Sequence, residues 1–95
     1  DGGGVDYDDN FIYWIGKENF KIVYLAYRYH SSGGGMRFRE VRKEHLIKGV
    51  SFVDYNNYKP KSPNVMLNNL DKIFENNKLI KISEINLEKI KLVFN

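Results

Sequence analysis

Tyr13 and Phe52 are aromatic residues in strand-forming segments, and a group of basic residues lies between them in the chain. A ring exposed on a sheet face can stack on an unpaired base, and each such contact is worth about 1–3 kcal/mol. Basic side chains on a neighbouring strand can contact phosphates, which makes affinity fall steeply as salt rises. The basic candidates are Arg37, Arg39, Arg42, Lys43 and Lys48. These residues predict a surface that binds single-stranded nucleic acid such as RNA. The alternative is that Tyr13 and Phe52 are ordinary core residues.

The charge of the chain is modest in total but unevenly distributed. The formal net charge is +3, yet four aspartates fall within the first nine residues, at Asp1, Asp6, Asp8 and Asp9. The remaining chain is therefore more basic than the total suggests, and a basic surface favours anionic partners. The alternative is a solvated, lysine-rich surface in a compositionally biased sequence.

Several kinds of catalytic or ligand-binding motif are missing from the sequence. His30 and His45 have no partner at metal-ligand spacing, and Asp6, Asp8 and Asp9 lack the terminal glutamate of a calcium loop. The glycines at positions 2–4 are not followed by the Lys-Ser/Thr of a phosphate loop. No serine has the setting of a nucleophile. We therefore predict a protein that is not an enzyme and that uses no metal and no cofactor.

Ninety-five residues fit a single domain, spanning residues 1–95. There are no cysteines, which excludes disulfides and fits a reducing compartment. No apolar run approaches the roughly 20 residues that span a bilayer. These features predict a soluble, intracellular protein without membrane contact. An exposed edge strand could pair with a second copy, but no residue selects an oligomeric state.

Residues 62–77 carry the helix signals of the sequence. Ser62 as N-cap and Pro63 at the first helical position are a favourable start. Asn76 and Asn77 suit the end, because asparagine tolerates the left-handed cap. The face predicted to be buried against a core consists of Val65, Met66, Leu70, Ile73 and Phe74.

The other segments predict strands and loops. Strands are expected over residues 11–15, 20–29, 37–43, 46–55, 79–82 and 89–94, with Gly49 as a possible bulge. A helix over 20–29 is the alternative there, and residues 83–88 could be a turn, a bulged continuation or one helical turn. Residues 1–9 are expected to be an acidic, Gly-rich tail or loop, and residues 56–61 a loop. The predicted class is α+β, with an antiparallel sheet of about five or six strands packed against one main helix, residues 62–77.

Residues 48–55 resemble the longer of the two signature strands of the RNA-recognition-motif family. Lys48, Gly49, Phe52, Val53 and Tyr55 match that pattern, whereas Val50 stands where an aromatic is usual. The resemblance implies that Lys48, Val50 and Phe52 face outward, and that Ser51, Val53 and Tyr55 face inward.

The second signature strand of that family would be residues 12–15, with Tyr13 as its stacking aromatic. The usual Asn-Leu ending is replaced by Gly16-Lys17. The family also requires a first helix over residues 20–29, where strand-forming residues dominate.

Two further interpretations concern other segments. The Tyr-rich hairpin of residues 11–29 suits a small protein-interaction or inhibitor domain, of viral or mobile-element type, because aromatic strands make good interface anchors. Residues 31–35, followed by Met36, could be a flexible Ser/Gly joint or an engineered linker. The chain would then be a circular permutant of an original that began at Met36 and ended at His30. The alternative is a natural glycine loop that precedes an ordinary methionine.

Overall fold

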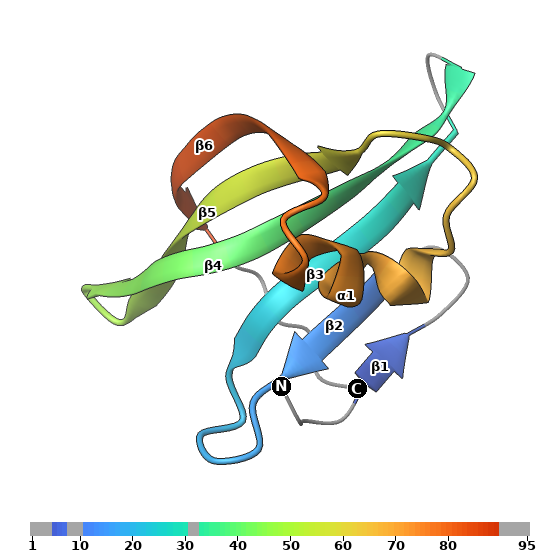
Figure 1. Cartoon of the computed structure of the whole chain (residues 1–95). Helices are drawn as coiled ribbons and strands as arrows, with labels where there is room; N and C mark the ends of the chain where they lie inside the picture. The colour runs from blue at the N-terminus through green and yellow to red at the C-terminus, as the bar shows by residue number, and fades with distance from the viewer. Residues whose placement is uncertain (1–4, 8–10, 31–32, 90–95) are drawn as a thin grey trace.

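Six antiparallel strands form one sheet in which the spatial order follows the chain order from β1 to β6 (Figure 1). This computed structural model describes residues 5–7, 11–30 and 33–89. The strands are β1 (Val5–Tyr7), β2 (Phe11–Ile15), β3 (Ile22–Tyr29), β4 (Gly35–Ile47), β5 (Val50–Pro60) and β6 (Leu79–Lys89). A 3-10 turn, η2 (Leu67–Asn69), and a short helix, α1 (Leu70–Glu75), connect β5 to β6. The predicted α+β class with an antiparallel sheet is confirmed, although the helix is short and most elements are strands.

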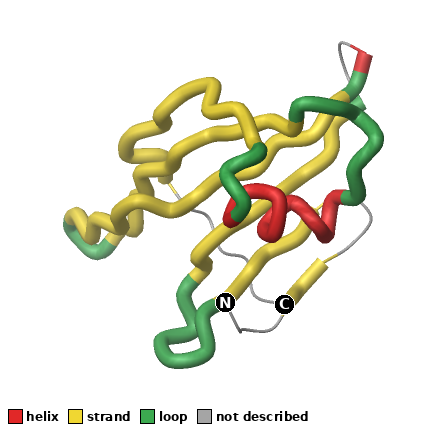
Figure 2. Tube along the Cα trace, in the orientation of Figure 1, coloured by secondary structure: helices red, strands yellow, loops and turns green. Residues whose placement is uncertain are grey.

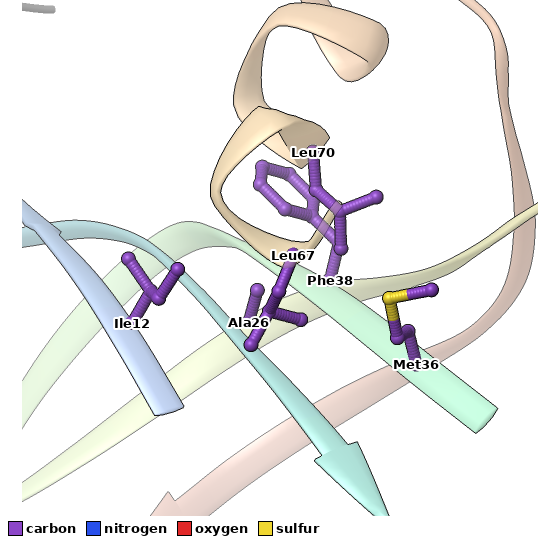
Figure 3. Packing of buried hydrophobic residues seen from close by; sticks show 6 residues of the cluster. All are labelled: Ile12, Ala26, Met36, Phe38, Leu67 and Leu70. Atoms are coloured by element: carbon purple, nitrogen blue, oxygen red, sulfur yellow. The ribbon is translucent and has the colours of Figure 1, made fainter. Parts of the chain in front are cut away.

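The helical segment covers one face of the sheet, and the main core lies between them (Figures 1 and 2). Its buried residues are Ile12, Ala26, Met36, Phe38, Leu67 and Leu70 (Figure 3). Ala26 is fully buried on β3, and its small side chain leaves room for the helical segment to approach. Below, this side of the sheet is called the helix-covered face.

Phe38 is the centre of this core. Its ring centroid lies 5.0 Å from that of Phe74, 5.1 Å from Tyr24 and 5.7 Å from Trp14, and the ring is fully buried. Aromatic pairs at these distances add to the stabilisation from burial alone. The Phe74 ring of α1 thus packs on rings from β3, β4 and β5, Tyr58 of β5 lying 5.0 Å away.

The start of the predicted helix is wrong, and its end is confirmed. Helical structure begins at Leu67, because Ser62 Oγ accepts the N–H of Asn64 at 3.2 Å in a local turn before any helix. Met66, expected on the buried face, is 63% exposed, and Leu67 is buried in its place. At the other end Asn77 has φ 59°, and the Lys78 N–H donates to the Ile73 carbonyl at 3.0 Å. This is a Schellman ending with asparagine in the left-handed position.

The expected strand over residues 46–55 is also corrected. Lys48 and Gly49 have φ 52° and 79°, and Ile47 pairs with Val50, so the two residues form the tight turn of the β4–β5 hairpin. Turns with two positive φ values match the twist of the flanking strands. Gly49 is therefore a turn residue and not a bulge. Strand β5 runs on to Pro60, in place of the loop predicted over residues 56–61.

Other segments settle alternatives that the sequence left open. Residues 22–29 form strand β3, so the alternative helix, which the RNA-recognition resemblance requires, is not formed there. Residues 83–88 are a bulged continuation of β6, with register shifts opposite β5. Residues 5–7, within the predicted tail of residues 1–9, form strand β1. They do so by backbone pairing with β2, which their amino-acid composition does not predict. The rest of that tail and residues 90–94 lie outside the described residues.

The chain between β3 and β4 is a hairpin in which Tyr29 pairs with Gly35. Met36 is 6% exposed and belongs to the main core, which gives a packing reason for a methionine after three glycines. Residues 31 and 32 of the suggested joint lie outside the described residues. In the part of the chain that the structure describes, no helix is long and apolar enough to cross a bilayer.

Candidate nucleic-acid interface

The sheet face opposite the helical segment carries rows of aromatic and basic residues. Because paired residues share a face and neighbours along a strand alternate, the ladder fixes which residues belong to it. Phe11 pairs with Tyr27 and Tyr27 with Arg37; Tyr13 pairs with Leu25 and Leu25 with Arg39. We call this surface the aromatic face, and it consists of Phe11, Tyr13, Tyr27, Tyr29, Arg37 and Arg39.

Three rings of the aromatic face, those of Phe11, Tyr13 and Tyr27, lie nearly parallel to one another, whereas Tyr29 is tilted by 52° relative to Tyr27. The Phe11 centroid is 6.0 Å from Tyr13 at an interplanar angle of 15°, and 5.5 Å from Tyr27 at 25°. Phe11 is 40% exposed and the three tyrosines are half-buried. Adjacent flat rings with accessible surface can extend a stack to an unpaired base.

Gly35 allows the fourth ring to lie across the sheet. A Cβ atom at Gly35 would be 2.8 Å from Cζ of Tyr29, so any side chain there would displace the Tyr29 ring. Tyr29 in turn lies under the guanidinium of Arg37, whose Cζ is 5.0 Å from the ring centroid. The glycine before Met36 thus has a role in this surface.

Both arginines lie over tyrosine rings. Arg39 Cζ is 5.5 Å from the Tyr27 centroid and 5.4 Å from that of Tyr55. Cations at such distances are attracted by the ring faces, which holds the guanidinium groups close to the sheet. Arg37 Nη1 donates to the Met36 carbonyl at 2.9 Å, and Arg39 Nη1 lies 3.1 Å from Glu88 Oε2. The surface is therefore cationic and aromatic over the same strands.

Three of the seven residues predicted for the site are brought together: Tyr13, Arg37 and Arg39. Phe52 is not brought to Tyr13. It pairs with His45 and shares its side of β5 with Tyr58, which packs on the helix-covered face, and strands β3 and β4 separate it from β2. The expected platform of Tyr13 beside Phe52 is therefore not formed, because the order and register of the strands place the rings on opposite faces.

The remaining three basic candidates do not belong to the aromatic face, although Arg42 and Lys43 line a groove beside it. Arg42 is at the register shift of β4 and donates to Asn86 Oδ1. Lys43 is exposed next to it, and Lys48 is exposed at the tip of the β4–β5 hairpin. Of the inward residues that the resemblance implied, Val53 and Tyr55 are buried at 3% exposure each.

Phe11, Tyr27 and Tyr29 belong to the surface but were not among the predicted site residues. The alternation of Leu25, Tyr27 and Tyr29 in β3 was visible in the sequence. Only the β2–β3 and β3–β4 registers show that these rings lie beside Tyr13 and Arg37.

A groove of about 600 Å³ continues the surface toward the β4–β5 hairpin. Val23, Val41, Val53 and Tyr55 line it, and Phe20 lies at its rim with 81% exposure. Lys21 Nζ and Glu44 Oε1 are 3.0 Å apart across it. The Glu44 carboxylate also accepts a hydrogen bond from Ser51, and these partners lower the pKa of Glu44.

A polar cluster links β4, β5 and β6 on the side of β5 that carries Phe52, opposite the aromatic face. His45 Nε2 lies 2.8 Å from Asp54 Oδ2, and the Leu87 N–H donates to Asp54 Oδ1 at 2.8 Å. These two contacts hold the pKa of Asp54 below its ordinary value, the histidine contact having the larger effect. The described residues contain no group of three or more His, Cys, Asp or Glu side chains that could hold a metal ion.

The profile of one protein family, described as a family of unknown function (DUF6503), matches residues 1–87. The match runs through residues 31–36 in the printed order, so it gives no support to a circular permutation. No curated protein and no solved structure matches the chain. The resemblance to the RNA-recognition motif stays a prediction.

Proposed function

We propose that this chain, which belongs to the family of unknown function DUF6503, is a non-catalytic module that binds single-stranded nucleic acid on its aromatic face. The observation that supports this proposal is the row of near-parallel rings of Phe11, Tyr13 and Tyr27 beside two arginines on one sheet face. The rings are the stacking partners and the arginines are the phosphate partners.

The chemistry of the surface fits a single strand better than a duplex. The faces of unpaired bases are free to stack on aromatic rings, whereas those in a duplex are occupied by neighbouring base pairs. Arg37 is the more available cation, because its guanidinium lies over Tyr29 and, among the described residues, donates to a backbone carbonyl and not to a carboxylate. Phe11, at 40% exposure, is the most accessible ring of the aromatic face.

The binding test compares two aromatic substitutions on opposite faces. Fluorescence anisotropy with labelled octauridylate, at two salt concentrations, gives the dissociation constant. Tyr13→Ala should weaken binding by about 5- to 150-fold, since one stacking contact is worth roughly 1–3 kcal/mol. Phe52→Ala is the matched control and should change affinity by less than about twofold, because Phe52 lies on the other side of β5.

Arginine substitutions separate stacking from electrostatics. Arg37→Gln should lower the binding constant, because one phosphate contact is lost. For the same reason the binding constant should depend less steeply on salt concentration in a log–log plot. Lys72→Gln, which removes the same charge from the exposed side of α1, over the opposite face of the sheet, is the control. Absence of binding at low salt, or equal effects of Tyr13→Ala and Phe52→Ala, would rule out the proposal.

A protein partner is the second candidate, favoured by the exposed apolar residues of the β2–β3 hairpin. Phe11 is 40% exposed, Val23 is 42% exposed, and an aromatic strand of this kind can anchor an interface. Recovery of a partner that survives nuclease treatment, and that Phe11→Ser abolishes, would favour this candidate over nucleic acid.

A further inference from the structure

The guanidinium of Arg39 is already occupied by an anion from the chain itself. Arg39 Nη1 donates to both carboxylate oxygens of Glu88, at 3.3 and 3.1 Å, and Nη2 donates to the Tyr27 hydroxyl at 3.4 Å. Nε is buried and has no hydrogen-bond partner among the described residues. Glu88 therefore satisfies one nitrogen and does not form the two-nitrogen fork that arginine makes with its best anions.

The Glu88 carboxylate belongs to a strained segment of β6, an edge strand of the described sheet. Glu88 follows Leu87, which has φ 55° and is 50% exposed. A bulky residue in the left-handed region is unfavourable and persists only where its surroundings hold it. Here the Leu87 N–H donates to Asp54 Oδ1, and the other oxygen of Asp54 forms a hydrogen bond with His45 Nε2. The strand also has one extra residue opposite Val53–Tyr55, so its register changes at this point.

Strand β6 is the last strand of the described sheet and pairs only with β5 there. Its residues near Glu88 can therefore shift without breaking a ladder on a second side. The Glu88 side chain is 43% exposed, whereas that of Arg39 is 18% exposed. The anion is the more accessible member of the pair, and its departure would uncover the guanidinium beside the rings of Tyr27 and Tyr55.

We propose that Glu88 is an internal competitor that occupies the phosphate position at Arg39, and that a bound phosphate group displaces it. The nucleic-acid identity of the ligand rests on the proposed function, whereas the phosphate position itself does not. A phosphate group offers several acceptor oxygens to the guanidinium, and two anions cannot share it without repulsion. Release of Glu88 also allows Leu87 to leave the left-handed region.

The test uses inorganic tripolyphosphate by calorimetry and labelled octauridylate by anisotropy. Glu88→Gln removes the competing charge and should tighten binding of tripolyphosphate about tenfold, as expected if Glu88 occupies Arg39 about nine-tenths of the time. Arg39→Gln should abolish tripolyphosphate binding. Glu84→Gln is the matched control on the same strand: Glu84 pairs with Lys81 at 2.7 Å, away from Arg39, and its loss should have little effect.

A second variant changes the strain and leaves both charges in place. Glycine adopts the left-handed region freely, so Leu87→Gly should stabilise the closed position of Glu88 and weaken tripolyphosphate binding by about threefold or more. A purely structural role for the Arg39–Glu88 pair would not produce opposite effects from Glu88→Gln and Leu87→Gly. Circular dichroism of each variant checks that the fold is kept, and Glu88→Ser replaces Glu88→Gln if it is not.

The outcomes separate this inference from the proposed function. Tighter tripolyphosphate binding by Glu88→Gln supports the internal competitor, even if octauridylate binds no variant and the nucleic-acid proposal is lost. Equal tripolyphosphate affinity for Glu88→Gln and the unsubstituted chain overturns the competitor, even if octauridylate binds. Absence of tripolyphosphate binding by every variant overturns it as well.

Discussion

Phe38 and Phe20 are both phenylalanines, but one is buried and the other is exposed. Their substitution should therefore lower the free energy of unfolding by very different amounts. Phe38 is fully buried among other rings, whereas Phe20 is 81% exposed in the β2–β3 turn. Phe38→Ala should lower the free energy of unfolding by about 3–5 kcal/mol, because it removes a large buried ring and leaves a cavity. Phe20→Ala should change it by less than about 1 kcal/mol. Urea denaturation followed by circular dichroism measures both, and similar losses would contradict the assignment of the core.

Asp54 is the carboxylate whose protonation should matter most for β6. Its pKa is lowered in the folded state, first by His45 and then by the Leu87 N–H. A depressed pKa means that Asp54 contributes stability above its unfolded-state value of 3.8, and that this contribution is lost as pH falls through the lower folded-state value. We expect the free energy of unfolding of Asp54→Asn to fall less steeply below about pH 4 than that of the unsubstituted chain. Identical profiles of unfolding free energy against pH for the two chains would contradict this.

The β4–β5 turn offers a sharp test of backbone geometry. Gly49 has φ 79°, and a Cβ there would meet no atom within 4 Å, so the cost of a side chain is conformational. Gly49→Ala should lower the free energy of unfolding by about 1 kcal/mol. Lys48→Asn should leave it unchanged or raise it slightly, since Asn-Gly suits this turn. Thermal unfolding distinguishes the two, and equal melting temperatures for all three chains would contradict the turn assignment.

Elements with a strong local signal could be predicted from the sequence. Strands β2 and β3 and the helix end at Asn77 were found because ring-rich and β-branched segments, and an asparagine cap, act locally. The helix start was misplaced because Ser62-Pro63 has the residues of an N-cap but makes a separate turn. Whether Tyr13 meets Phe52 depends on strand order and on the register shift near Arg42. No local pattern carries that information.

The ionisation of tyrosines reports the packing on both faces of the sheet. Burial is the main cause that raises the pKa of Tyr24, Tyr55 and Tyr58 above the ordinary value of 10.0. Nearby carboxylates add to the shift, Glu75 for Tyr24, Glu88 for Tyr55 and Glu40 for Tyr58.

A raised folded-state pKa means that these tyrosines stabilise the fold fully below pH 10 and progressively less as pH rises through their folded-state values. Absorbance at alkaline pH should therefore show a late group of tyrosines in the folded chain that becomes uniform in urea. One uniform transition in the folded chain would show that these rings are solvated.

The spatial order of the strands, from β1 to β6, is also the order in which the ribosome synthesises them. Each strand pairs with the one synthesised just before it, so every new ladder can close as soon as a few residues leave the ribosome. Phe38 belongs to β4, whereas its partners Tyr58 and Phe74 come from β5 and α1. A growing chain could therefore complete the hairpins up to β5 before α1 is available to cover Phe38. During that interval its most hydrophobic surface would be exposed to chaperones.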